Sequence, residues 1–160
     1  MKKFVHECLF CMYELSELSD ADRALINEAK EATYRSYSPY SHFSVGAAAL
    51  LANGAIVTGC NQENAAFPSG QCAERTTLFY ANAQYPDTPI SALAIAARDT
   101  EGFTAQPTPP CGACRQVILE TEMRYHQPIR IILYGTEGTC IVERGVKDLL
   151  PLLFDASFLK

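Results

Sequence analysis

Two short segments, Cys72-Ala73-Glu74-Arg75 and Pro110-Cys111-Gly112-Ala113-Cys114, constrain the fold of this chain more than any other feature. Together they offer three thiolates, with a carboxylate two residues after the first. Catalytic zinc sites use three protein ligands and leave the fourth tetrahedral position for water, whereas structural sites close with four. A metal that acidifies water, beside a carboxylate that moves its protons, suits hydrolysis. The pattern therefore predicts a fold that brings both segments together, and it indicates an enzyme.

The length and charge of the chain limit the classes of partner that we expect it to bind. A chain of 160 residues suits one domain and is long enough to bury a core without disulfides. The formal net charge is -5, and no run of Lys or Arg is longer than Lys2-Lys3. Phosphate neutralisation dominates affinity for nucleic acids, so an acidic chain without a basic stripe is a poor binder of them. We expect a small neutral substrate and no nucleic-acid partner.

The cysteines and the N-terminal residues indicate the compartment. Seven cysteines is an odd number, and they lack the tight clustering of a small secreted scaffold. His6 and Glu7 interrupt the apolar stretch after Lys2-Lys3, which argues against a signal peptide. No apolar run approaches the roughly 20 residues that span a bilayer. We expect a cytoplasmic protein with reduced thiols and no membrane partner.

Turn residues and apolar periodicity divide the chain into strands and helices. Residues 1–18 are an N-terminal extension, interpreted as an added strand or arm, and residues 19–160 are interpreted as a single domain. Asn53-Gly54 predicts a type I′ turn between two strands. Strands separated by helices predict a mixed sheet covered on both faces. The expected helices are 19–34, 72–83, 111–124 and 146–154, and the expected strands are 43–52, 55–60, 90–97, 129–134 and 139–143.

Other cysteines offer a competing metal site. Cys8 and Cys11, joined with Cys111 and Cys114, could form a closed structural Cys₄ site. On a strand, however, Cys8 and Cys11 point to opposite faces, and we interpret both as core residues. Two groups of residues are also not expected to bind metal: Cys60 and Cys140 are interpreted as buried, and His6, His42 and His126 as structural or surface residues.

Two arginines directly follow the cysteine motifs. Zinc held by three thiolates carries a formal charge of -1, which opposes acidification of its water. Guanidinium donors and helix N-termini near the sulfurs withdraw charge from them and restore acidity. We assign this role to Arg75. For Arg115 the same role and a solvated helix face stay equally open.

Around these residues the chain resembles the cytidine deaminases of the small form that uses three cysteine ligands. The resemblance covers nearly everything from Asp20 to Phe154, and four motifs occur in the right order and spacing. It implies an α/β fold, a three-layer α/β/α sandwich with a mixed central sheet. The matching segments, besides the two above, are Pro39-Tyr40-Ser41-His42-Phe43-Ser44-Val45-Gly46-Ala47, Gly59-Cys60-Asn61-Gln62-Glu63-Asn64-Ala65-Ala66 and Leu149-Leu150-Pro151, and the second motif continues through Arg115-Gln116.

The resemblance implies a role for each matching residue at the reacting base. Cys72, Cys111 and Cys114 would hold Zn²⁺. Glu74 would move protons from the activated water to the pyrimidine N3 and then to the departing ammonia. The backbone N–H of Ala73 would hold the base carbonyl, and Arg75 would hold cysteine sulfurs.

The resemblance also implies contacts with the sugar and with neighbouring subunits. Asn61 and Glu63 would bind ribose hydroxyls, and Phe43 would pack on the nucleoside. On spacing alone, Asn61 and Glu63 could equally bond the backbone of their own loop. The resemblance also implies a homotetramer with shared active sites. Phe154 matches an aromatic residue that reaches an adjacent site, or it anchors the last helix in the core.

The resemblance implies hydrolytic deamination of cytidine and deoxycytidine in pyrimidine salvage. An alternative is a related aminopyrimidine-nucleoside deaminase of the blasticidin S type, and a second is a non-catalytic zinc-binding protein. A buried amide and carboxylate that face sugar hydroxyls favour a nucleoside over a free base. The chain departs from the family at residues 1–18, at Pro109 and in the loop 100–109.

Overall fold

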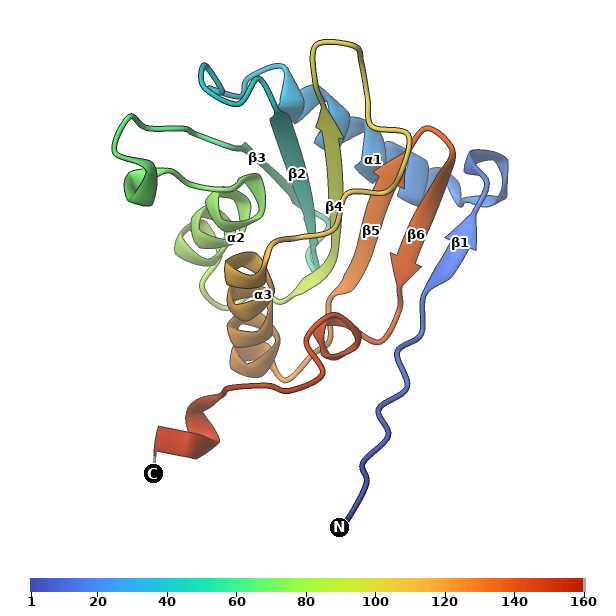
Figure 1. The fold of residues 1–160 in the computed structure, drawn as a ribbon, viewed down its shortest axis with the longest axis vertical. Helices are drawn as coiled ribbons and strands as arrows, with labels where there is room; N and C mark the ends of the chain where they lie inside the picture. The colour runs from blue at the N-terminus through green and yellow to red at the C-terminus, as the bar shows by residue number, and fades with distance from the viewer. Residues whose placement is uncertain (160) are drawn as a thin grey trace.

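The computed structural model describes residues 1–159 and consists of one central sheet with helices on both faces (Figure 1). Its strands and helices alternate along the chain as the sequence predicts. The elements are strand β1 (Cys11–Tyr13), helix α1 (Asp20–Thr33), strands β2 (Ser44–Leu51) and β3 (Ile56–Cys60), helix α2 (Ala73–Gln84), strand β4 (Ile90–Arg98), helix α3 (Gly112–Tyr125) and strands β5 (Arg130–Gly135) and β6 (Gly138–Val142).

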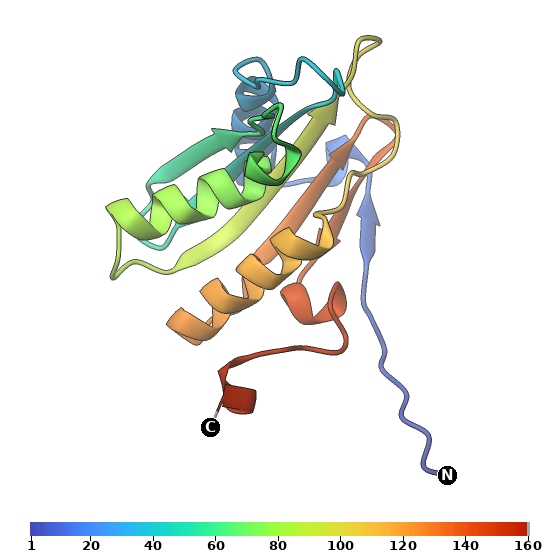
Figure 2. The ribbon, with the colours of Figure 1, turned by 60° about the vertical axis from the view of Figure 1, so that its left-hand side comes forward.

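The sheet is mixed, with six strands in the order β1-β6-β5-β4-β2-β3. Strands β4 and β5 are parallel, with Leu93 opposite Ile131, and every other neighbouring pair is antiparallel. A parallel pair needs a crossover, and α3 supplies it between β4 and β5. Helix α1 covers one face, while α2 and α3 lie side by side on the other (Figures 1 and 2). The predicted three-layer α/β/α sandwich is confirmed.

Helix α1 forms where the sequence provides a cap and one apolar face. The Ser19 hydroxyl accepts the Asp22 amide at 3.1 Å, which satisfies one of the free N–H groups of the first turn. Leu25, Ile26 and Ala29 are buried against the sheet. The helix approaches β2 so closely that a Cβ at Gly46 would overlap the Ala29 carbonyl. Glycine at this strand position therefore sets the distance between the two layers.

Helices α2 and α3 pack on the opposite face through Leu78 and Ile118, which are both fully buried. A Cβ at Gly59 on β3 would overlap the Thr77 side chain, so α2 also lies close to the sheet. The two helices begin at the same end of the molecule (Figure 2). This arrangement brings the residues that precede each helix, Cys72 and Cys111, to one place.

Two predictions of local structure are wrong. Gly54 has a φ of 85°, but Asn53 is not among the residues with positive φ, so the hairpin turn is not type I′. Gly54 instead donates to Leu51 at 2.9 Å, and Leu51 donates to Ala55 at 2.9 Å, which is a type I turn followed by a left-handed glycine. The helix expected over 146–154 is a 3₁₀ turn at Val146–Asp148 only. Pro151 disfavours helical geometry at the residue before it, and a second 3₁₀ turn follows at Ala156–Leu159.

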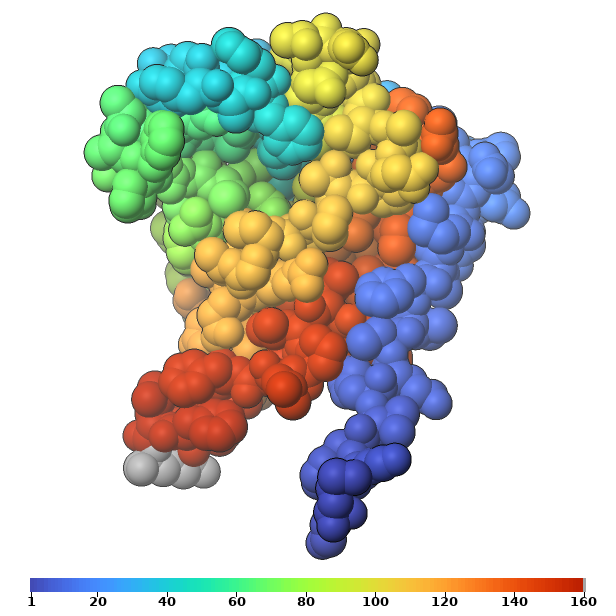
Figure 3. Space-filling view, in the orientation of Figure 1, coloured from blue at the N-terminus to red at the C-terminus, as the bar shows by residue number. Residues whose placement is uncertain are grey.

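The N-terminal residues form an arm that joins the edge of the sheet. Residues 1–10 have neither strand nor helix, and β1 pairs with β6 through Met12 opposite Cys140. Cys8 is exposed and Cys11 is half-buried, so the interpretation of both as core residues is wrong, because the arm extends along the surface. Both termini extend from the same end of the molecule (Figure 3). Within residues 1–159, no helix has the length and apolar character needed to cross a membrane.

Candidate metal centre and active site

The cysteines of the two motifs meet in one cluster. The sulfurs of Cys72, Cys111 and Cys114 all lie within 4.8 Å of one another. Cys72 Sγ is 3.8 Å from Cys111 Sγ, which is 3.4 Å from Cys114 Sγ. Zinc–sulfur bonds of 2.3 Å at tetrahedral angles separate two sulfurs by about 3.8 Å. The three thiol groups therefore fit a zinc ion with little movement, and no fourth His, Cys, Asp or Glu within residues 1–159 belongs to this cluster.

Helix starts position all three sulfurs. Cys72 is the N-cap of α2, Cys111 is the N-cap of α3, and Cys114 lies in the first turn of α3. Unpaired N–H groups and the positive end of the helix dipole favour thiolate at such positions. The hydrogen bond from the Cys114 thiol, and then Arg75, hold the pKa of Cys72 well below its ordinary value. The surroundings of Cys72 therefore favour its thiolate form before a metal binds.

Glu74 lies beside the cluster and is almost fully buried. Burial, and then the negative charge of Cys72, raise the pKa of the Glu74 carboxyl above its usual value. A hydrogen bond with the Cys114 thiol acts in the opposite direction and connects this carboxyl group to the cysteine cluster. A carboxyl group with a raised pKa next to a metal site is suited to accept a proton and return it.

The two arginines have different environments. Arg75 donates from Nη2 to Cys72 Sγ at 3.6 Å, at the place assigned to it from the sequence. Arg75 Nε is buried and has no hydrogen-bond partner within residues 1–159. Arg115 instead donates to the carbonyls of Pro110 and Leu149. This geometry excludes the solvated helix face for Arg115, and its hydrogen bonds go to backbone carbonyls rather than to sulfur.

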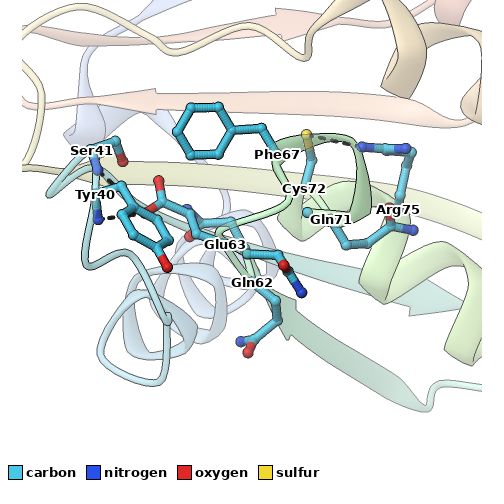
Figure 4. Close-up of a pocket in the computed structure, with 11 residues that line it drawn as sticks. Tyr40, Ser41, Gln62, Glu63, Phe67, Gln71, Cys72 and Arg75 are labelled. Carbon is cyan, nitrogen blue, oxygen red and sulfur yellow. Dashed lines mark hydrogen bonds between the residues drawn. The ribbon is translucent and has the colours of Figure 1, made fainter.

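A cavity of about 510 Å³ opens beside Cys72 and Arg75 (Figure 4). Its other walls are the loop before β2 and the loop between β3 and α2. The rings of Tyr40 and Phe67 meet edge to face at 5.8 Å across these two loops. The residues that line the cavity are Tyr40, Ser41, Asn61, Gln62, Glu63, Asn64, Phe67, Gly70, Gln71, Cys72 and Arg75. Seven of these residues are not among the predicted site residues, although they lie within or near the motif segments: Tyr40, Ser41, Gln62, Asn64, Phe67, Gly70 and Gln71.

Asn61 lies in the cavity wall, and its side chain forms hydrogen bonds with β2 and with the loop before β2. Its Oδ1 accepts the Val45 amide at 2.8 Å and the Ser36 hydroxyl at 2.6 Å. Its Nδ2 donates to the Phe43 carbonyl at 2.9 Å. One side chain therefore connects β3 to the loop before β2, and one N–H of its amide remains available to the cavity.

Glu63 also binds the loop before β2, through one of its two carboxylate oxygens. Oε2 accepts the amides of Tyr40 at 2.8 Å and Ser41 at 3.2 Å, drawn as dashed lines in Figure 4. Bonds from Ser41, and then from Tyr40, lower the pKa of Glu63. The carboxylate is thus ionised at neutral pH. Asn61 and Glu63 therefore bond the segment before and at the start of β2, and not the backbone of their own loop, which is one of the two interpretations that their spacing leaves open.

The other two expected substrate residues lie at the edge of this region. Phe43 is half-buried and does not line the cavity, although its carbonyl is held by Asn61. Ala73 is fully buried at the first position of α2, where a backbone N–H has no partner inside the helix. Cys60 and Cys140 are buried, as expected from the sequence.

A second group of possible ligands, His6, Cys8 and Asp148, also lies within 4.8 Å. The Asp148 side chain is fully buried and both of its oxygens accept from Arg144, at 2.6 and 2.8 Å. Arg144 also donates to the Glu7 carbonyl at 2.6 Å. The guanidinium occupies the position of a cation, so we interpret this group as an ion pair that anchors the arm.

Comparison with known proteins identifies the family. Residues 19–127, which include all three cysteines of the cluster, match the model of the cytidine and deoxycytidylate deaminase zinc-binding region. The cytidine deaminase of Sporosarcina psychrophila is 51% identical over 130 residues, 81% of this chain and 88% of that protein. The cytidine deaminase of Halalkalibacterium halodurans is 42% identical over 132 residues, 82% of this chain and 92% of that protein.

The fold agrees with these matches. The crystal structure of cytidine deaminase from Burkholderia pseudomallei has a TM-score of 0.71 and 37% sequence identity to this chain. The superposition covers 86% of this chain and 100% of the other. The sequence match, the shared fold and the three-cysteine cluster lead to one conclusion: this chain belongs to the cytidine deaminase family and carries its zinc-binding region.

Proposed function

We propose that this protein converts cytidine and deoxycytidine, with water, into uridine and deoxyuridine and ammonia, as an enzyme of pyrimidine salvage. The observation that carries the proposal is the convergence of three cysteine sulfurs on one point beside the buried carboxyl group of Glu74. Three ligands leave the fourth position of a tetrahedral ion available for reaction. The adjacent cavity of about 510 Å³ lies within the range of small-molecule sites.

Glu74 is proposed as the group that moves protons. When held by Cys72, Cys111 and Cys114, zinc supplies a Lewis acid that makes water a nucleophile near neutral pH. Glu74 accepts a proton from the attacking water and delivers it to N3 of the pyrimidine. Water adds at C4, and Glu74 then helps to protonate the amino group, which leaves as ammonia when the bond from C4 to nitrogen breaks. The raised pKa of the Glu74 carboxyl makes the carboxylate a better proton acceptor, and a pKa closer to the working pH suits a group that must also return the proton.

The nucleoside is proposed to bind across the loops that line the cavity. The free N–H of Ala73 is suited to hold the base carbonyl, and the Phe43 ring to pack on the nucleoside. The available N–H of Asn61 and the carboxylate of Glu63, which both line the cavity, are suited to ribose hydroxyls. Cytosine without a sugar would leave these two polar groups unpaired, which predicts strong discrimination against the free base.

The decisive experiment compares the protein with its Glu74→Gln variant. Loss of ultraviolet-monitored turnover of cytidine by about 10²–10⁴-fold, with zinc content retained, is the expected result. Equal activity in both proteins would remove Glu74 from the mechanism and leave a non-catalytic zinc protein. A panel of cytidine, deoxycytidine, cytosine and blasticidin S then identifies the substrate class, and turnover of blasticidin S alone would favour the alternative deaminase.

We also propose that the protein is a homotetramer with shared active sites, and that residues 1–18 form an extension of a single domain, residues 19–160. Exposed apolar side chains on both terminal segments support assembly: Phe4 is 93% exposed and Leu152 is also 93% exposed. Thiolate ligands require a reducing compartment, which supports a cytoplasmic location. Light scattering of the full chain and of a form lacking residues 1–10 tests assembly. A monomeric full chain would contradict the tetramer. If the truncated form has the same number of subunits as the full chain, the arm is not part of the interface.

A further inference from the structure

Arg115 joins the metal-binding segment to the C-terminal part of the chain. Its Nε donates to the Pro110 carbonyl at 2.9 Å, and its Nη1 donates to the Leu149 carbonyl at 2.6 Å. The residue is half-buried between these two carbonyls. Hydrogen bonds from a charged donor are about twice as strong as neutral ones, and the planar guanidinium holds both acceptors in a defined geometry.

The positions of these contacts relate them to the metal centre. Pro110 comes directly before Cys111, and Arg115 comes directly after Cys114. The Arg115–Pro110 bond therefore joins the two ends of the short segment that contains both sulfurs. A carbonyl fixed by a charged donor restrains the peptide that carries the first ligand. The same side chain extends this restraint to Leu149, directly after the 3₁₀ turn Val146–Asp148.

The next residue adds a second connection to the C-terminal segment. Gln116 donates from Nε2 to the Phe154 carbonyl at 2.8 Å. Between Leu149 and Phe154 the chain has neither helix nor strand, and it passes along α3 before its final 3₁₀ turn (Figure 2). Two consecutive residues in the first half of α3 thus hold the segment 149–159 at two points. Both follow Cys114, so the metal ligand and the two holding residues share one stretch of helix.

We propose that Arg115 is a positioning residue that holds Cys111 and Cys114 in place for zinc and couples zinc binding to the docking of residues 149–159. The proposal rests on the part of the proposed function that assigns zinc to the three cysteines, and it is independent of the nucleoside. Coupling between two sites is reciprocal. If docking of the C-terminal segment restrains the ligands, zinc in the cluster must stabilise that docking by the same factor.

The first experiment measures zinc affinity by competition with a chromophoric chelator. Replacement of Arg115 by Met removes both hydrogen bonds and keeps the aliphatic stem. The Arg115→Met protein is expected to bind zinc about 10–100-fold more weakly, the usual effect of losing a residue that supports a metal ligand. Arg115→Lys, which retains the charge and can still reach one carbonyl, is expected to recover part of the loss.

Arg124→Met is the matched control. Arg124 lies on the same helix and also donates to a backbone carbonyl, that of Pro86, at 2.8 Å. It lies near the end of α3 that is remote from Cys111. Its loss is expected to leave zinc affinity unchanged. Equal zinc affinity of Arg115→Met and the unmodified protein, or equal weakening in both variants, would overturn the positioning role.

The second experiment needs no variant and tests the coupling directly. Amide hydrogen exchange is followed in the unmodified protein with zinc bound and after zinc is removed by a chelator. The amides of Leu149 and Leu150 donate to Val146 at 2.8 Å, so they report on the segment that Arg115 holds. Their exchange is expected to accelerate without zinc, whereas exchange in α1, on the far face of the sheet, serves as the reference.

The outcomes separate this inference from the proposed function. Faster exchange after zinc removal, confined to residues 149–159 and to the segment before α3, supports the coupling. In Arg115→Met, the exchange rate of residues 149–159 is expected to be the same with and without zinc. No change in residues 149–159, or the same change in α1, would refute the coupling even if Arg115→Met fails to fold. A protein that binds zinc and shows the coupling but does not deaminate cytidine would contradict the proposed function alone.

Discussion

The Arg75 guanidinium reaches back one turn of α2 and donates to the Cys72 sulfur across 3.6 Å. The helix makes this contact possible, because residues three apart lie on the same face. A positive charge at this distance stabilises the thiolate relative to the thiol. Arg75 is therefore the side chain best placed to offset the negative charge of a cluster of three sulfurs.

Replacement of Arg75 by Gln tests this charge effect before any metal binds. The hydrogen bond from Cys114 and then Arg75 lower the pKa of Cys72, so the variant is expected to have a higher Cys72 pKa in the zinc-free protein. The sign follows from the loss of a cation beside the thiolate. Alkylation of Cys72, measured against pH by mass spectrometry, gives this pKa. Arg35→Gln, which removes an exposed bond to Thr58, is the control. An unchanged profile in Arg75→Gln would show that the guanidinium does not act on the sulfur.

Replacement of Asn61 by Ala is expected to damage both stability and substrate binding. The variant leaves the Val45 amide and the Phe43 carbonyl without their partner, at a cost of about 2–4 kcal/mol in the free energy of unfolding. Asn53→Ala is the matched control, since Asn53 accepts one exposed amide, that of Ala55, and its loss should cost less than about 1 kcal/mol. Urea unfolding measures both, and KM for cytidine is expected to rise only in Asn61→Ala. A similar small loss in both variants would show that Asn61 does not hold the loop.

The sequence predicts the metal centre well because its determinants are local. Cys72 and Cys111 each begin a helix, and helix starts can be recognised from a few neighbouring residues. The order of strands and helices along the chain predicts a mixed sheet covered on both faces, and the family resemblance implies the three layers. The hairpin turn at Asn53-Gly54 shows the limit of this reasoning. Glycine permits a left-handed residue, and Gly54 adopts one, but the same dipeptide allows more than one turn type.

Features that depend on contacts between distant segments could not be predicted. The partner of Arg115 is a carbonyl at Leu149, and no pattern of residue types identifies a backbone acceptor 34 residues away. The position of Cys8 depends in the same way on Arg144 and Asp148, which hold the arm on the surface. From the sequence, strand geometry argues against a shared metal site for Cys8 and Cys11, and it favours the interpretation of both as core residues. Only the fold shows that the arm runs along an edge of the sheet.

Replacement of Asp148 by Asn is expected to loosen the N-terminal arm. Arg144, and also the Leu9 amide, hold the pKa of Asp148 below its ordinary value, so the pair stabilises the fold above the unfolded pKa of about 3.9. This contribution disappears as pH falls through the lower, folded pKa. At pH 7 the variant is expected to lose about 1–3 kcal/mol, since Arg144 is partly exposed and can be solvated.

Urea unfolding at several pH values, with limited proteolysis of residues 1–10, measures both effects of this change. The difference between Asp148→Asn and the unmodified protein should narrow below about pH 4. Asp20→Asn is the control, because Asp20 pairs with Arg23 on the surface and its side chain is 98% exposed. A difference that stays constant with pH, or an arm that is cleaved equally in all three proteins, would refute the anchoring role.

Replacement of Glu122 by Gln is expected to preserve or increase stability at neutral pH, although it alters a partly buried carboxylate. Glu122 Oε1 accepts the amides of Ile129 and Val146, both at 2.9 Å, and joins α3 to the segments on either side of β5 and β6. Burial raises the pKa of this carboxyl, and the two amides only partly offset that effect. The folded state therefore favours the protonated form, and ionisation at pH 7 works against folding.

Glutamine retains an oxygen for both amides and removes the charge. The unmodified protein should gain stability relative to Glu122→Gln as pH falls through the raised pKa, and the gain should be complete below the unfolded value of about 4.3. Glu122→Ala, which leaves both amides without an acceptor, should instead lose about 2–3 kcal/mol. Glu120→Gln, an exposed neighbour on α3, should have no effect. Equal instability of Glu122→Gln and Glu122→Ala at pH 7 would contradict this expectation. It would mean that the two amides require the negative charge of the carboxylate, and that the cost of burying this charge is the smaller effect.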